Sequence, residues 1–350
     1  MDTAAFSHNL RRVREHAPGC RVLAVVKANG YGHGIVVAAR ALAAADAFAV
    51  ARVEEGVALR EAGIAARVVL LGGVQDAGEL AVAAAHGFDL FVHRDAQVAM
   101  LERWPGPHRF RVWLKVDSGM GRLGFRPADV PQATARLAAC AGVAQPPLLA
   151  THLAESEARG NARTRAQIEC FAQATAGLAG ERSIANSAGL IAWPEARADW
   201  VRPGIMLYGV SPFPDATGAD LGLRPVMSFE TRVIAVKDLA AGDRVGYGGA
   251  WQARAPARIA IAAAGYGDGY PRAAPNGTPV LVNGLPGALA GRVSMDMLAI
   301  DVSGRDDVAA GDPVQLWGPG LPVERVAGAA GTIGYELICR VSRRVPLEVR

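Results

Sequence analysis

The stretch Ala24-Val25-Val26-Lys27-Ala28-Asn29-Gly30-Tyr31-Gly32-His33-Gly34 ends a short apolar strand with a lysine and continues into a glycine-rich loop. A lysine at that position lies partly in the apolar layer of a sheet, which favours its neutral amine, and the neutral amine can attack a carbonyl. The glycines let the backbone approach a bulky ligand, and Tyr31 adds a hydroxyl at the rim. The stretch therefore predicts that Lys27 holds an aldehyde cofactor as a Schiff base.

Outward from that stretch, residues 22–209 alternate short apolar runs with amphipathic helical patterns. Eight alternations over about 200 residues match a (β/α)8 barrel in length and order. An open doubly wound sheet is the competing interpretation, since periodicity alone does not separate the two. The expected strands are 21–27, 48–51, 68–71, 88–92, 110–116, 148–153, 182–185 and 200–207. The expected helices include 54–62, 77–85, 96–104, 128–141 and 164–178.

After Pro212-Phe213-Pro214 the pattern changes to short β-branched runs rich in glycine and proline. The expected strands there are 228–236, 258–264, 279–282, 298–302 and 313–317, with one short helix near 323–330. A chain of 350 residues also exceeds the usual size of a single core. We therefore predict two domains, a barrel over residues 1–221 and a mostly β domain over residues 222–350.

Composition narrows the class of protein. The chain is 51% hydrophobic and 20% charged with a net charge of +4, and it has no basic block, so nucleic-acid binding is not expected. The four cysteines are far apart and lack metal-ligand spacing, which favours a reducing compartment and no metal site. No signal peptide or membrane span is visible, so we expect a cytoplasmic protein that does not bind membranes.

In a (β/α)8 barrel the chemistry lies at the carboxyl ends of the strands. Beyond Lys27, polar residues lie at the ends of the fifth, sixth and seventh expected strands and at the eighth: Lys115 to Arg122, His152, Asn186-Ser187, and Arg202 to Ile205. We expect Ser187 to cap a helix over 188–192, where free N–H groups favour an anion. With the backbone of Gly204 and Ile205 and the Tyr31 hydroxyl, this predicts a phosphate cradle, although an ordinary capping serine is the simpler alternative.

In the β domain, the stretch Ala264-Gly265-Tyr266-Gly267-Asp268-Gly269-Tyr270-Pro271 follows an apolar strand. Its glycines do not form a dinucleotide loop, because prolines follow where a helix is required. A glycine-flanked tyrosine at a strand end is suited to entering another site. The polar segments 291–296 and 332–336 lie between expected strands, and simple turns are one structural interpretation of them.

The motifs AVVKANGYGHG, KVDSGMGRLGF, NSA, RPGIMLYG, GYGDGYPR, GRVSMDM and TIGYEL occur in an order and spacing that resemble alanine racemases, over nearly the whole chain. The resemblance implies a pyridoxal 5′-phosphate (PLP) enzyme with a fold-type III barrel and a β domain, active as a homodimer with shared sites. It implies interconversion of L- and D-alanine by two bases, through a Schiff base between PLP and the substrate, supplying D-alanine for peptidoglycan.

The resemblance also implies roles for individual residues. Lys27 binds PLP and acts as base on the D-face of the substrate, and Tyr266, from the partner subunit, is the base on the L-face. Arg202 bonds the pyridine nitrogen, and His152 links Arg202 to Tyr266. The residues implied to hold the phosphate are Tyr31, Ser187, Gly204, Ile205 and Tyr335. The substrate carboxylate is bound by Arg122 and the backbone of Met295, and Lys115 matches a lysine that is carbamylated in many members.

Three other functions stay open from the sequence. A non-catalytic PLP-binding protein has a similar barrel but no second domain, which residues 222–350 argue against. A fold-type III decarboxylase shares the two-domain plan but not the motifs GYGDGYPR and GRVSMDM. A racemase of a related substrate such as serine differs only in pocket size, which is worth about 1–3 kcal/mol.

Overall fold

The computed structural model describes all residues, 1–350, and they divide into two compact units. The barrel unit comprises Phe6–Leu207. The C-terminal unit comprises Met1–Ala5 together with Tyr208–Arg350.

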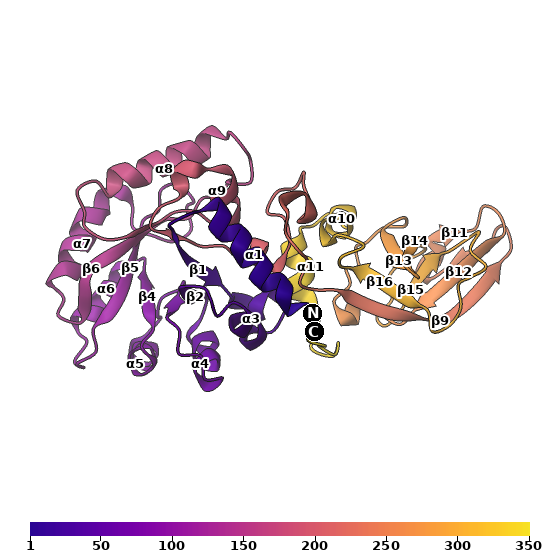
Figure 1. The fold of residues 1–350 in the computed structure, drawn as a ribbon, viewed down its shortest axis with the longest axis horizontal. Coiled ribbons are helices and arrows are strands. Elements are labelled where there is room, and N and C mark those ends of the chain that lie inside the picture. Colours follow the sequence, from indigo (N-terminus) through magenta and orange to yellow (C-terminus); the bar gives the residue numbers. More distant parts are fainter. The chain divides into compact units, whose positions relative to one another are not determined.

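Eight parallel strands close the barrel unit in chain order, with helices around them (Figure 1). The first and eighth strands pair, with Val22 opposite Val201, so the open-sheet alternative is wrong. The strands are β1 Arg21–Val25, β2 Ala47–Val50, β3 Val68–Leu70, β4 Asp89–Val92, β5 Phe110–Lys115, β6 Val143–Ala150, β7 Arg182–Ser183 and β8 Trp200–Val201. The helices are α1 Thr3–His16, α2 Lys27–Tyr31, α3 Ile35–Ala41, α4 Val53–Glu61, α5 Ala77–His86, α6 Asp95–Glu102, α7 Val130–Ala139, α8 Ala162–Ala174 and α9 Ser187–Ala192. Single 3-10 turns are η1 Pro127–Asp129, η2 Pro194–Ala196 and η3 Ile205–Tyr208.

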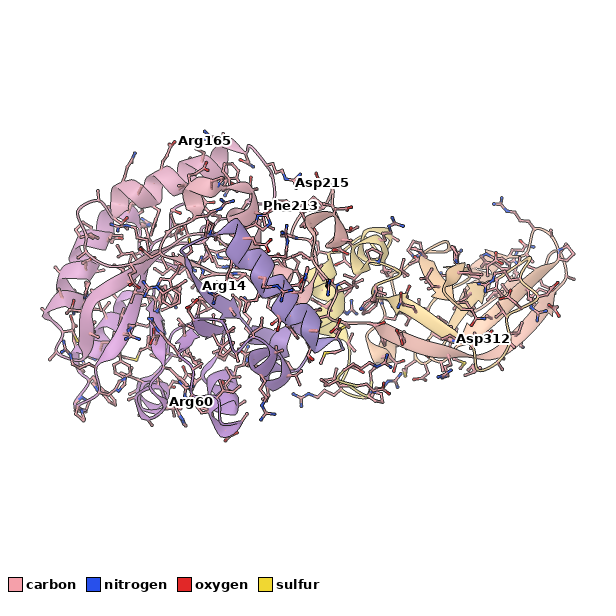
Figure 2. All side chains as sticks on the ribbon, viewed as in Figure 1. Arg14, Arg60, Arg165, Phe213, Asp215 and Asp312 are labelled. Atoms are coloured by element: carbon pink, nitrogen blue, oxygen red, sulfur yellow. The ribbon has the colours of Figure 1, made fainter.

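Burial explains why these segments form these elements. Every residue of β2, β3 and β4 is buried, as expected for parallel strands covered on both faces. Helix α1 buries Phe6, Leu10 and Val13 at helical spacing. Arg14 on α1 and Arg165 on α8 are exposed on the outer faces of their helices (Figure 2). None of the helices combines the length and the apolar character needed to cross a bilayer.

The segment after β1 differs from the expected loop. Strand β1 ends at Val25, and Lys27 begins a short left-handed turn in which Ala28, Asn29 and Tyr31 have φ of 54°, 53° and 50°. Left-handed residues other than glycine cost about 1 kcal/mol or more each, so tertiary contacts must hold them. One such contact is the Ile35 N–H, which donates to Asn29 Oδ1 at 3.1 Å.

A closed barrel of antiparallel strands forms the core of the C-terminal unit, in the order β12-β15-β14-β13-β16-β9 (Figure 1). Its strands are β9 Phe229–Leu239, β12 Ala257–Ala262, β13 Pro279–Val282, β14 Leu285–Leu289, β15 Leu298–Asp301 and β16 Pro313–Trp317. A separate ribbon pairs β10 Arg244–Val245 with β11 Trp251–Gln252. The helices are α10 Val323–Ala329 and α11 Gly334–Arg340, and the 3-10 turns are η4 Ala219–Leu221, η5 Tyr247–Gly249 and η6 Tyr266–Asp268.

The fold class is thus confirmed, with three corrections to individual elements. Segment 332–336 is not a turn between strands, because Ile333 precedes helix α11 as its N-cap. Strand β14 and the ribbon were not expected. The eighth expected strand, 200–207, is shorter, because the chain turns into a 3-10 helix at Ile205.

Candidate active site

Cationic side chains gather where the barrel strands end. Lys115, the last residue of β5, is only 7% exposed. Its burial, and then the charges of Arg202 and Arg122, lower the pKa of Lys115 to about 8. The positive charges that lower the pKa of Lys115 and of His152 belong to one group of side chains at this end of the barrel. We call this group the cation cluster: Lys27, Lys115, Arg122 and Arg202.

The carboxylate that acts on Lys115, that of Asp117, accepts hydrogen bonds from its own loop. Asp117 Oδ1 accepts the N–H groups of Gly119, Met120 and Gly121 at 3.1, 2.9 and 3.0 Å. Burial alone raises the pKa of Asp117, but these three donors outweigh it and lower the pKa. A carboxylate held this way organises the loop after β5, and it supplies one negative charge beside the four cations of the cluster.

Arg202 is held rigidly across the ends of β6 and β7. Its guanidinium is 5% exposed and donates to Ser183 Oγ at 2.6 Å, to Thr151 O at 2.5 Å and to Ile184 O at 3.1 Å. Burial lowers the pKa of Arg202 to about 10, so it stays charged at neutral pH. A fixed, permanently charged donor is therefore available inside the barrel mouth.

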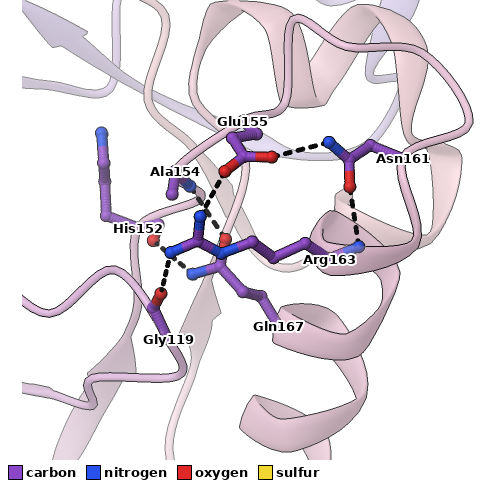
Figure 3. A network of polar contacts seen from close by, with 7 residues as sticks. All are labelled: Gly119, His152, Ala154, Glu155, Asn161, Arg163 and Gln167. Atoms are coloured by element: carbon purple, nitrogen blue, oxygen red, sulfur yellow. Dashed lines mark hydrogen bonds and ion pairs between the residues drawn. The ribbon is translucent and has the colours of Figure 1, made fainter.

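His152 follows β6 and is neutral at neutral pH. Burial, and then the charges of Arg202 and Lys115, lower the pKa of His152 well below its ordinary value. Its carbonyl accepts from Gln167 Nε2 at 3.2 Å, and Gln167 Oε1 accepts the Ala154 N–H at 2.9 Å (Figure 3). Helix α8, which carries Gln167, therefore fixes the loop that presents His152.

The same helix also holds the loop after β5. Arg163 pairs with Glu155 and donates to Gly119 O at 3.3 Å, and Asn161 donates to Glu155 at 2.7 Å (Figure 3). A Cβ on Gly119 would lie 3.3 Å from Gln167 Cγ. Two loops that carry site residues are thus tied to one helix.

Hydroxyl and backbone donors converge beside this cluster. Ser187 Oγ accepts the Gly204 N–H at 2.9 Å and the Met206 N–H at 3.5 Å. A Cβ on Gly204 would lie 2.5 Å from Tyr31 Oη, so glycine is required for this approach. Ile205 is fully buried beside Gly204. Small hydroxyl and backbone N–H groups that meet at the same end of the barrel as several cations fit an anionic group such as a phosphate.

The expected role of Ser187 as a helix cap is wrong. The N-cap of α9 is Asn186, whose Oδ1 accepts the Gly189 N–H at 2.9 Å, and Ser187 is the first helical residue. Asn and Ser cap equally well, so the sequence did not choose between these neighbours. The shift frees the Ser187 hydroxyl to bond the backbone at Gly204.

Tyr266 and Met295 lie on adjacent loops of the C-terminal unit. The Tyr266 N–H donates to Ser294 O at 3.0 Å, and the Gly267 N–H donates to Met295 O at 2.9 Å. Met295 is 53% exposed. Tyr335 is the second residue of α11 and is half-buried.

The structure therefore sorts the expected site residues into two sets. The barrel unit carries Lys27, Tyr31, Lys115, Arg122, His152, Ser187, Arg202, Gly204 and Ile205, and the C-terminal unit carries Tyr266, Met295 and Tyr335. Sequence reasoning missed the residues that hold these groups in place. They include Gln167, Arg163 and Ser183, and no local sequence signal marks the contacts that these three residues make across the fold.

Comparisons with known proteins cover the whole chain. Residues 1–212 match the family model "Alanine racemase, N-terminal domain", and residues 226–349 match "Alanine racemase, C-terminal domain". An alanine racemase of Aeromonas hydrophila is 51% identical over 348 residues, which are 99% of this chain and 98% of that protein. The crystal structure of biosynthetic alanine racemase from Pseudomonas aeruginosa has a TM-score of 0.97 at 45% identity, covering 100% of this chain and 98% of that chain. The crystal structure of alanine racemase from Bartonella henselae with covalently bound pyridoxal phosphate has a TM-score of 0.90 at 28% identity. That match covers 100% of this chain and 98% of that chain.

Proposed function

The chain belongs to the alanine racemase family, and from this we propose which of its residues hold the cofactor and move the proton. It is an isomerase that interconverts L- and D-alanine, its close relatives include a biosynthetic form, and its cofactor is PLP. The match of residues 226–349 to the second family model excludes the barrel-only PLP-binding protein. The observation that carries the residue assignment is the cluster of four cations beside the Tyr31–Ser187–Gly204 cradle.

Two bases on opposite faces of the substrate explain racemisation most simply. When bound, PLP withdraws electrons from the substrate Cα and makes its hydrogen acidic. The Lys27 amine holds the cofactor and exchanges a proton on the D-face. The Tyr266 hydroxyl exchanges a proton on the L-face. The cradle binds the phosphate together with Ile205 and Tyr335, and Arg122 and the Met295 N–H bind the substrate carboxylate.

A neutral His152 is suited to connect Arg202 with Tyr266. A guanidinium only donates hydrogen bonds, whereas a neutral imidazole has one donor and one acceptor nitrogen. His152 can therefore accept from Arg202 and donate to the Tyr266 oxygen, which favours the basic form of that phenol. Arg202 itself stays charged and can only donate hydrogen bonds, so a pyridine nitrogen held by Arg202 would be left without a proton.

We place Tyr266 and Met295 in the partner subunit's site, within a homodimer. Large apolar side chains are exposed beside these loops, including Met295 at 53% and Met297 at 47%, and Leu123 next to Arg122 at 37%. Exposed apolar groups of this size favour an interface with another protein surface. All four cysteines are free thiols, which supports a reducing, cytoplasmic location.

We further propose that Lys115 is carbamylated. A neutral amine attacks CO₂ and releases one proton, and the pKa of about 8 at Lys115 makes that form accessible near neutral pH. The product replaces a positive charge with a negative one among Arg202, Arg122 and Lys27, so the cluster stabilises it. With ¹³C-bicarbonate, a protein-bound carbamate carbon signal is expected to grow as the pH rises through 8 and to vanish in Lys115→Met. A wild-type spectrum identical to that of the variant contradicts the assignment.

Substituting alanine at Gly204 is expected to weaken PLP binding. The new Cβ would lie only 2.5 Å from Tyr31 Oη, so the Tyr31 hydroxyl must move away. Overpacking of about 1–3 kcal/mol raises the dissociation constant about 5- to 150-fold, measured by titrating apoenzyme with PLP. The matched control is Gly328→Ala in α10, where an added Cβ meets nothing within 4 Å. If Gly204→Ala and Gly328→Ala bind PLP with equal affinity, Gly204 and Tyr31 are not part of the phosphate cradle.

Borohydride reduction tests the assignment of Lys27 directly. Treatment of the yellow holoenzyme is expected to abolish racemisation and to fix the cofactor irreversibly to one lysine. Peptide mass spectrometry then identifies that lysine, and we expect Lys27. Label on Lys115 or Lys237 instead would refute the assignment while leaving membership of the family untouched.

A further inference from the structure

Arg344, in the segment after α11, contacts both loops of the C-terminal unit that carry proposed site residues. Its Nε donates to Asp268 Oδ1 at 2.7 Å, and its Nη2 donates to Asp296 Oδ1 at 2.7 Å and to Met295 O at 3.4 Å. Asp268 ends the turn that Tyr266 begins, and Asp296 directly follows Met295. One guanidinium therefore connects the turn of the proposed L-face base with the loop of the proposed carboxylate donor.

The Tyr266 turn has little freedom to move against its neighbours. A Cβ on Gly265 would lie 2.2 Å from Ser294 O, and one on Gly267 would lie 2.8 Å from Arg344 Nη2. Asp268 closes the turn because its Oδ2 accepts the Gly265 N–H at 2.8 Å, which leaves Oδ1 for Arg344. The Ser342 N–H also donates to Asp268 O at 3.0 Å, so the same segment holds the turn through its backbone.

Charge balance explains what Arg344 adds to this packing. Asp268 and Asp296 stand on neighbouring loops, and their hydrogen bonds to Arg344 raise the pKa of the guanidinium, which stays charged. Without it, two carboxylates would repel one another beside the loop that is proposed to bind the substrate carboxylate. Arg344 is 47% exposed, and ion pairs of that kind contribute little to overall stability. The effect of these contacts is therefore on loop spacing rather than on folding.

We propose that Arg344 is a positioning residue that sets the distance between the Tyr266 turn and the Met295 loop, and so aligns the L-face base with the substrate carboxylate. This rests on the proposed roles of Tyr266 and Met295. Displacing a base by about 1 Å slows its proton transfer by up to about 100-fold. Proton transfer by the Lys27 amine, on the opposite face of the substrate, is unaffected. Arg344 should thus act selectively on one face of the substrate and on substrate affinity.

The test is Arg344→Met in the holoenzyme, with KM, kcat and exchange of the Cα hydrogen of each enantiomer measured in deuterium oxide. We expect a higher KM and exchange on L-alanine reduced about 10-fold or more relative to exchange on D-alanine. Arg344→Lys should restore only part of the loss, since one ammonium lacks the two-pronged geometry. The control is Arg340→Met, because Arg340 is 45% exposed and its guanidinium pairs only with Glu336, at 3.0 Å.

Asp296→Asn provides a second variant should Arg344→Met fold poorly. Asp296 is 56% exposed, and its carboxylate bonds Arg344. A raised KM in Asp296→Asn, together with exchange reduced on L-alanine relative to D-alanine, supports the proposal. An Arg344→Met enzyme that matches Arg340→Met, or that loses exchange equally on both enantiomers with KM unchanged, overturns it. If Tyr266→Phe keeps full exchange on L-alanine, the base assignment itself fails, which is a separate result.

Discussion

Replacing Tyr266 with phenylalanine is expected to abolish exchange of the Cα hydrogen of L-alanine with deuterium oxide, while D-alanine still exchanges. The variant lacks the proton acceptor on the L-face and keeps the Lys27 amine on the D-face. Loss of a general base lowers the rate by about 10²- to 10⁴-fold. Proton NMR of the Cα signal measures the two exchange rates in separate reactions, each started from one pure enantiomer, because the enantiomers have identical spectra.

Exchange, rather than net racemisation, must be measured here. The two enantiomers have equal free energy, so kcat/KM in the two directions must stay equal in any variant, and racemisation alone cannot reveal which face was damaged. Tyr270→Phe is the matched control, because Tyr270 lies in the same segment, is fully buried against Trp317, and its hydroxyl has no hydrogen-bond partner. Equal losses on both enantiomers in Tyr266→Phe, or a similar loss in Tyr270→Phe, would sink the two-base assignment.

Lys27→Ala is expected to be inactive alone, and to regain activity when it forms mixed dimers with inactive Tyr266→Phe chains. If each site combines the barrel of one subunit with Tyr266 of the other, a mixed dimer has one intact site and one doubly damaged site. Random pairing makes half of the dimers mixed, so about one quarter of wild-type activity returns. Co-refolding of the two chains followed by a racemisation assay measures this.

A second pair of variants tests whether activity returns for a reason other than a site shared between two chains. Lys27→Ala mixed with Arg202→Ala should stay inactive, because both changes lie in the barrel unit and every mixed dimer then has two damaged barrels. Native mass spectrometry confirms that mixed dimers are present. Mixed Lys27→Ala and Tyr266→Phe dimers without activity would show that Tyr266 serves a site in its own chain, or no site.

The alternation of strands and helices was readable from the sequence, whereas barrel closure was not. Closure depends on β8, which is two residues long and pairs with β1 through Arg21 and Val22. Such short pairing leaves no periodic signal. Strand β6 begins at Val143, earlier than the expected start at residue 148. The expectation was too late because proline is rare inside a strand, and Pro146 and Pro147 lie within β6.

The chemistry-bearing residues of the site could be predicted, but not the contacts that position them. Lys27, His152 and Arg202 stand at strand ends, where barrel topology alone brings them together. The left-handed turn after Lys27 was missed, since alanine and asparagine favour other conformations and only tertiary contacts reverse that preference. The link from Gln167 to His152 joins residues 15 apart across a helix and a loop, so no local pattern announces it.

The left-handed turn places Lys27 and Tyr31 four residues apart, close to one full turn of about 3.6 residues. The covalent anchor and the phosphate-side hydroxyl proposed for the cofactor are therefore parts of one short, stiff peptide. Small movements of the barrel strands relative to one another do not change the length of peptide that joins Lys27 to Tyr31.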